Sequence, residues 1–176
     1  MAVSNRERGA RALEIAAEAL GPFVAKQLAP HVPAGTEWPV VLRVLDEEKG
    51  HDKTGFLYAS TDLSLQLRVM TERLGALGFP FSSVLSRAEQ NLAGELRDIR
   101  NRAAHGAPFN FDATYRALDT AERLLRAADQ PTAADRIKVE RTDLQRAQIE
   151  AETRRDVRES TSISGLGDVD LTPWRE

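Results

Sequence analysis

The segment from Ser82 to Ala104 constrains the fold most strongly, because its apolar residues recur at helical spacing. A buried stripe is predicted at six positions: Val84, Leu85, Ala88, Leu92, Leu96 and Ile99. After the first of these, the steps are three or four residues, which is the period of one face of an α-helix. Ser82 or Ser83 is expected to cap the start of this helix, and Gly106 and Pro108 are expected to end it near Ala104.

The rest of the N-terminal part also predicts helices rather than strands. Their expected starts are Ser4 or Asn5, Pro22, Pro39, Asp62 and Asp112. The pair Gly21-Pro22 is expected to interrupt the first helix, because proline lacks a backbone donor. The helix that starts at Asp62 is expected to carry Leu74 and Leu77 on its inner face. The sequence therefore predicts an all-α protein.

Three regions are expected along the chain, with a boundary at Gln130-Pro131-Thr132. Residues 1–130 form a helical domain, residues 131–159 a charged helical arm, and residues 160–176 a disordered tail or linker. The arm has a thin apolar seam at Ile137, Leu144 and Ala151, so it has little to bury. Because no closing element precedes Glu176, we expect a fragment of a longer protein with a downstream module.

Composition and charge exclude several classes of protein. The chain has no cysteine, which excludes disulfides, thiolate metal sites and cysteine nucleophiles. His31 and His51 have no second ligand at metal spacing, and no glycine-rich phosphate loop is present, so no metal or cofactor is predicted. No apolar run reaches membrane-spanning length, which predicts a cytoplasmic protein with no membrane partner. The net charge of −3 requires any RNA contact to be a local basic patch.

The end of the predicted helix at 82–104 combines three groups suited to phosphodiester chemistry. Arg100 is a fixed planar cation that can hold phosphate oxygens, and His105 can transfer a proton near neutral pH. Asn101 adds an amide that shares a face with His105 if the helix persists. The nearby Arg97 and Arg102 would supply the RNA-binding patch. The alternative interpretation is a surface arginine beside a histidine that satisfies a helix C-terminus.

The motif Arg100-Asn101-x-x-x-His105 resembles the Arg-polar-x-x-x-His motif of HEPN domains, a helical family rich in metal-independent ribonucleases. The flanking stretches 95–99 and 118–125 resemble the branch found at the N-terminus of large bacterial defence proteins with ATPase or helicase modules. That branch also includes eukaryotic RNA-quality-control endonucleases. The resemblance covers roughly residues 6–128, although Ala103 and Ala104 stand where this branch often has an aromatic residue.

The resemblance implies a HEPN-like helical bundle with a charged C-terminal helical extension. It also implies a homodimer whose site forms where two copies meet, each contributing Arg100, Asn101 and His105. The implied activity is cleavage of RNA without a metal, giving 2′,3′-cyclic phosphate and 5′-hydroxyl ends. Two alternatives stay open: an RNA sensor that does not cleave, and a non-catalytic dimerisation or assembly module that couples to a downstream ATPase.

Overall fold

The computed structural model describes residues 3–51 and 55–164, with side chains as far as residue 161, and this part of the chain is helical without strands. Short 3₁₀ turns connect some of the α-helices. The α-helices are α1 (Asn5–Leu28), α2 (Val40–Glu48), α3 (Leu63–Thr71), α4 (Arg87–Ala104), α5 (Phe111–Ala127) and α6 (Pro131–Ser164). The all-α prediction is confirmed.

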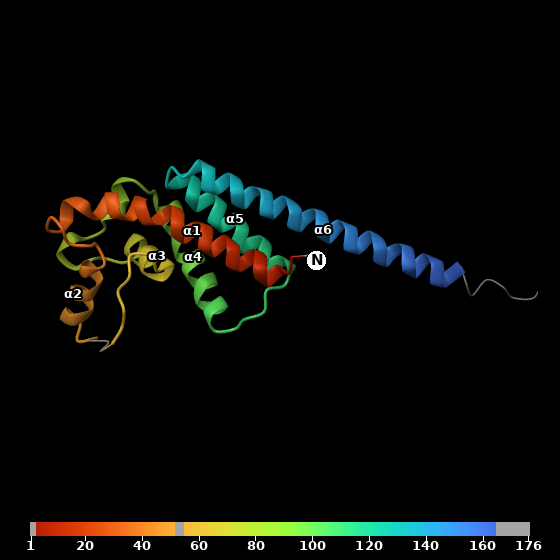
Figure 1. The fold of residues 1–176 in the computed structure, drawn as a ribbon, viewed down its shortest axis with the longest axis horizontal. Helices are drawn as coiled ribbons and strands as arrows, with labels where there is room; N and C mark the ends of the chain where they lie inside the picture. The colour runs from red at the N-terminus through yellow and green to blue at the C-terminus, as the bar shows by residue number, and fades with distance from the viewer. Residues whose placement is uncertain (1–2, 52–54, 165–176) are drawn as a thin grey trace, which may run out of the picture.

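The helices pack around α5, which contacts α1, α4 and α6 (Figure 1). Helix α3 packs against α1 and α4 on the other side of the bundle, and α2 lies at the end away from the N-terminus. One continuous apolar core joins these helices. Helix α6 continues past the bundle as a single rod (Figure 1). This arrangement places the C-terminal end of α4 at an edge of the bundle, next to the loop that leads to α5.

Helix α1 begins as predicted but does not break at Gly21-Pro22. Ser4 accepts a hydrogen bond from the Glu7 amide, and the Glu7 carboxylate accepts one from the Ser4 amide, which forms a capping box. The predicted interruption is wrong, because α1 runs on to Leu28 with Pro22 inside it. Its buried face continues on both sides of the proline, and this packing offsets the cost of the missing backbone hydrogen bond.

Helices α3 and α4 differ from the predictions at one end each. Asp62 caps α3 as predicted, but α3 ends at Thr71, so Leu74 and Leu77 lie beyond it. The next residue, Glu72, has an extended backbone, which stops the helix there. The start of α4 is capped by Ser86 through a second capping box, and not by Ser82 or Ser83, which belong to a 3₁₀ turn.

The buried face of α4 starts later than predicted, because the helix itself does. Leu85, Leu96 and Ile99 are buried, whereas Val84 is 44% exposed and Ala88 is also exposed. Helix α5 also starts earlier than predicted. Its cap is Asn110, whose side chain accepts a hydrogen bond from the Ala113 amide at 2.8 Å, and Asp112 lies inside the first turn.

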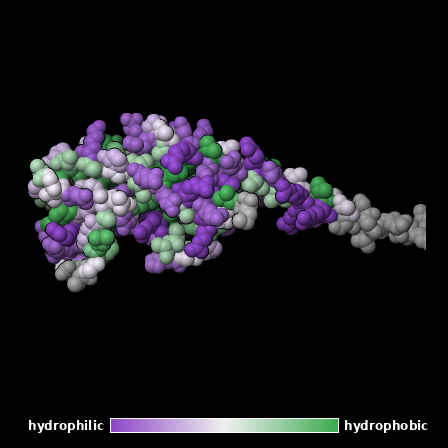
Figure 2. Space-filling model, viewed as in Figure 1, coloured by the Kyte–Doolittle hydropathy of each residue, from purple (hydrophilic) through white to green (hydrophobic). Residues whose placement is uncertain are grey.

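Helix α6 has two parts with different surroundings. The expectation that the arm has little to bury is wrong for the first part: Ala134 and Ile137 are fully buried and Leu144 is 3% exposed. From residue 149 to residue 161 every side chain is exposed, including Ala151 of the predicted seam. On the face shown in Figure 2, hydrophilic side chains dominate this projecting rod.

The remaining expectations about the C-terminus are only partly within the described residues. Residues 160–164, expected to belong to a disordered tail, continue α6 as helix. Residues 165–176, the rest of the expected tail or linker, lie outside the described part of the chain. The domain boundary at residue 130 stays a prediction, although the buried side chains of α6 argue that its first part belongs to the bundle.

Candidate functional site

The end of α4 has the backbone geometry that its sequence predicts. His105 is the C-cap residue, and Gly106 follows with a φ of 77°. The Ala107 amide donates to the Arg102 carbonyl and the Gly106 amide donates to the Ala103 carbonyl. This pair of bonds is a Schellman motif, which glycine favours because it has no Cβ to strain a positive φ. The motif fixes where the chain leaves the helix immediately after His105.

Arg100 lies in a cleft of about 360 Å³ between α3 and α4. Its guanidinium donates to Asp62 Oδ1 over 3.3 Å, and about a third of its side chain is exposed. The same Asp62 oxygen accepts the Ser64 amide at 2.8 Å, which is the N-cap bond of α3. Arg100 is therefore within reach of solvent but already has a carboxylate partner.

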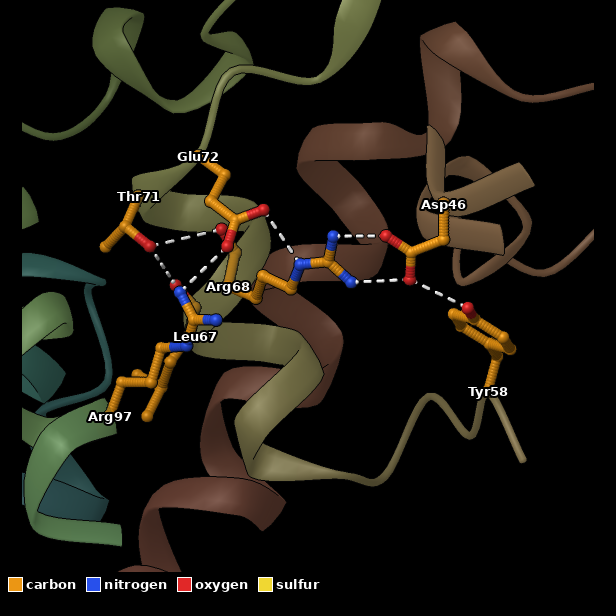
Figure 3. A network of polar contacts seen from close by, with 7 residues as sticks. All are labelled: Asp46, Tyr58, Leu67, Arg68, Thr71, Glu72 and Arg97. Carbon is orange, nitrogen blue, oxygen red and sulfur yellow. Dashed lines mark hydrogen bonds and ion pairs between the residues drawn. The ribbon is translucent and has the colours of Figure 1, made fainter. Parts of the chain in front are cut away.

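The same cleft contains Arg97, one of the predicted RNA contacts, in a chain of ion pairs (Figure 3). Arg97 donates to Glu72 at 2.9 Å, and Glu72 also accepts from Arg68 at 2.8 Å. Arg68 binds both oxygens of Asp46 at 2.8 and 2.5 Å, and Tyr58 donates to Asp46 at 2.7 Å. This network ties α2, α3 and α4 together and neutralises the charge on Arg97.

The network also shifts the proton affinities of its members. Hydrogen bonds to Asp46 raise the pKa of Arg68 well above its ordinary value. Burial alone would raise the pKa of Glu72, but the hydrogen bonds and charges of Arg68 and Arg97 outweigh it and leave that pKa below its usual value. At neutral pH Arg68 and Glu72 therefore form a charged pair.

Asn101 and Arg102 line a different cleft, of about 580 Å³, on the α5 side of α4. They share it with Asp98 and with the ion pair of Glu95 and Arg116. Helical spacing predicts that Arg100 and Asn101 both lie away from the buried stripe, and they do so on different sides of the helix.

His105 lines neither of these two clefts, and its side chain is exposed at the end of α4. Among the described residues, the structure records no hydrogen bond between its imidazole and Arg100. One copy of the chain therefore does not bring Arg100, Asn101 and His105 together in a single cleft.

Metal clusters and membrane spans are both missing from the described part of the chain. Within residues 3–51 and 55–164, no group of three or more histidine, aspartate or glutamate side chains could hold a metal ion. None of the helices in these two ranges is long and apolar enough to cross a membrane.

The kind of domain that carries this motif follows from a match to a known protein family. The family model for Swt1-like HEPN domains matches residues 11–129, which include most of α1, all of α2 to α5 and the whole motif. The chain belongs to the Swt1-like HEPN family. No curated protein and no solved structure matches it significantly. The resemblance inferred from the motif is thus confirmed, and it associates this HEPN domain with RNA-related function.

The carboxylates around the HEPN motif were not identified as site residues from the sequence. Asp62 was interpreted correctly as a helix cap, but its contact with Arg100 joins residues 38 positions apart. Asp46 and Glu72 were not identified because their contacts with Arg68 and Arg97, respectively, join α2 to α3 and the C-terminal end of α3 to α4. What the sequence does show is that Arg97 and Arg100 lie three residues apart and so share a helix face, which predicts that they meet the same neighbours.

Proposed function

We propose that this HEPN domain is a metal-independent endoribonuclease. The observation that carries the proposal is His105: it stands exposed at a fixed helix end, five residues after Arg100, in a chain of the Swt1-like HEPN family. An imidazole at this position has space around it for a substrate. The 2′-hydroxyl of RNA supplies the nucleophile, so the protein needs to contribute only proton transfer and charge stabilisation.

The division of the motif between two clefts supports a site shared by two copies of the domain. In one copy, Arg100 faces the α3 side of α4 and Asn101 faces the α5 side. A two-fold axis near the end of α4 would bring the exposed His105 of both copies to one substrate strand. A specific dimer of this kind buries about 1,000 Å² or more in total. The homodimer and its composite site are parts of the proposal.

In the proposed mechanism, His105 acts as general base on the ribose 2′-hydroxyl or as general acid on the leaving 5′-oxygen. Positioned proton transfer of this kind contributes about 10²–10⁴-fold to the rate. Arg100 stabilises the charge that develops on the phosphorus oxygens, a contribution of roughly 3–4 kcal/mol for one preorganised donor. Asn101 orients His105 or binds a phosphate oxygen. The products are a 2′,3′-cyclic phosphate and a 5′-hydroxyl.

The two predicted RNA contacts have different environments in a single copy. Arg102 is exposed and has no ion pair within the described residues, so it is available to a phosphate. Arg97 is held by Glu72 and would have to exchange that partner for the RNA backbone. We therefore assign the first backbone contact to Arg102.

A second candidate function is a non-catalytic assembly module that dimerises and couples to a downstream ATPase or helicase in a cytoplasmic defence or RNA-processing protein. The observation that favours it is the pairing of Arg97 and Arg100 with carboxylates, which leaves little free positive charge in their cleft. The exposed rod of α6 would then connect the HEPN bundle to the ATPase or helicase module.

The deciding experiment incubates labelled single-stranded RNA with the purified chain in EDTA. The wild type should cleave, His105→Ala should not, and Arg100→Lys should also fail because a point charge does not replace a planar fork. His31→Ala and Arg43→Lys are matched controls, since both residues are exposed and lie outside the clefts of the motif. Cleavage that EDTA abolishes, or that persists in His105→Ala, would contradict the mechanism. A stable dimer without cleavage would favour the assembly module.

A further inference from the structure

Asp62 performs two tasks with a single oxygen atom. Its Oδ1 accepts the Ser64 amide at the start of α3 and also accepts a hydrogen bond from Arg100. The first bond holds a helix end, and the second neutralises the arginine that the proposed function assigns to the phosphate. The two tasks can be separated chemically, because only the second depends on the negative charge.

The cleft around Arg100 is balanced in charge. Its lining includes three arginines and three carboxylates: Arg68, Arg97, Arg100, Asp46, Asp62 and Glu72. Each of these guanidiniums has at least one carboxylate partner. A phosphate that approached Arg100 in this state would meet the charge of Asp62 at close range, and like charges repel most where solvent screening is incomplete.

Arg100 has the weakest of the three pairings. Arg68 binds Asp46 through two hydrogen bonds, and the side chains are only 13% and 5% exposed. Arg97 binds Glu72 at 2.9 Å. Arg100 makes one contact of 3.3 Å, with its side chain 34% and that of Asp62 27% exposed. An incoming anion would therefore displace the partner of Arg100 before the others.

We propose that Asp62 sets the phosphate affinity of this site by competing with the substrate phosphodiester for Arg100. The inference rests on the proposed function, and it makes Asp62 a positioning residue that acts through Arg100. In the free protein Asp62 holds the guanidinium in the cleft and keeps its affinity for phosphate low. When a phosphodiester binds, Arg100 exchanges the carboxylate for phosphate oxygens, and Asp62 remains the cap of α3.

The test uses Asp62→Asn in the full chain, because asparagine caps a helix as well as aspartate does but has no charge. Glu47→Gln is the matched control: it removes one negative charge from an exposed ion pair with Arg43, outside the cleft. If Asp62→Asn folds poorly, the variant Asp62→Ser is used in its place, since serine is also a good N-cap residue. Thermal melting checks the fold of each variant.

Two probes are used, both in EDTA: a 2′-O-methyl single-stranded RNA that cannot be cleaved, and inorganic pyrophosphate. Fluorescence anisotropy measures RNA binding, and the shift of the Nε–Hε NMR signal of Arg100 during a titration measures pyrophosphate binding. We expect Asp62→Asn to lower the Kd for both probes about three- to tenfold, and Glu47→Gln to leave both nearly unchanged. In an Arg100→Ala background, the gain in RNA affinity from Asp62→Asn should disappear.

Each outcome of these measurements is decisive. An unchanged or raised Kd in Asp62→Asn would overturn the inference and would show that Asp62 assists Arg100 or has no effect on it. A gain in RNA affinity that persists without Arg100 would also overturn it. If no variant binds RNA, the proposed function fails, and the pyrophosphate titration still decides the role of Asp62: a lower Kd in Asp62→Asn supports the competition, and an equal Kd refutes it.

Discussion

Two truncations within α6 test whether its first part belongs to the HEPN bundle. One chain ends at residue 130 and lacks α6 entirely, and the other ends at residue 148 and keeps the part that packs against α5. The thin apolar seam of the arm, taken from the sequence alone, predicts that removing the whole arm costs little stability. The buried side chains of the first part of α6 reverse that expectation for the shorter chain.

The expected loss of stability depends on the contacts that each truncation removes. Burying Ile137 and Leu144 contributes about 1.5–3 kcal/mol each. Arg141 forms ion pairs with Asp119 and with Glu122, whose side chain is only 8% exposed. Glu122 keeps Arg126 as a partner without α6, so the loss of Arg141 costs about 1.5–3 kcal/mol, as for a hydrogen bond to a charged group. Together these terms come to about 4.5–9 kcal/mol, which is comparable with the stability of a whole domain, about 5–15 kcal/mol.

Thermal unfolding followed by circular dichroism at 222 nm distinguishes the two chains. The chain ending at residue 148 should melt within about 5 °C of the full chain, because every side chain that the structure describes beyond residue 148 is exposed. The chain ending at residue 130 should show no cooperative transition, or one at least about 15 °C lower. Cooperative melting of the shorter chain near the full-length temperature would refute the reasoning and would make α6 a separable arm.

Three further predictions concern the bundle itself. Gly9→Ala should lower the free energy of unfolding in urea by about 1–2 kcal/mol, since a Cβ there would lie 2.6 Å from the Phe109 ring. Gly94→Ala should raise it by up to about 1 kcal/mol, because a Cβ there has its nearest neighbour at 3.9 Å and alanine favours a helix. Asp46→Ala should cost about 1.5–3 kcal/mol in the same assay, because the mostly buried Arg68 guanidinium loses its bidentate partner and keeps only Glu72; a cost below about 1 kcal/mol would contradict this. Because the pKa of Glu72 is lowered in the folded state, its contribution to stability is present above the usual value of 4.5 and is lost as the pH falls below it. Glu72→Gln should therefore flatten the pH dependence of the melting temperature below pH 4.5, and an unchanged slope would refute it.

Features that depend on neighbouring residues in the sequence were predictable, and the end of α4 is the best example. Gly106 and Pro108 stop the helix locally, so the position of His105 could be predicted from a few residues. The start of α4 was just as local, since Ser86 and Glu89 form a capping box with the standard spacing. The prediction at Ser82 or Ser83 missed that signal because Val84 and Leu85 were assigned to one helical stripe.

Features set by tertiary packing were not predictable from the sequence. Pro22 lies inside α1 because the buried face on both sides of it outweighs a local preference. The contact of Asp62 with Arg100 depends on how α3 packs against α4, which no local pattern encodes. Helical spacing placed Arg100 and Asn101 away from the core, but it did not indicate that neighbouring helices would separate them into two clefts.

The chemistry of the RNA ends tests the proposed ribonuclease function most directly. A short RNA is incubated with the full chain in EDTA, and the fragments are identified by mass spectrometry beside an RNA with a single 2′-deoxy nucleotide at the cleavage position. The proposed mechanism predicts 2′,3′-cyclic phosphate and 5′-hydroxyl ends, with no cleavage at the 2′-deoxy position. Fragments with 3′-hydroxyl and 5′-phosphate ends, or cleavage of the 2′-deoxy substrate, would contradict it.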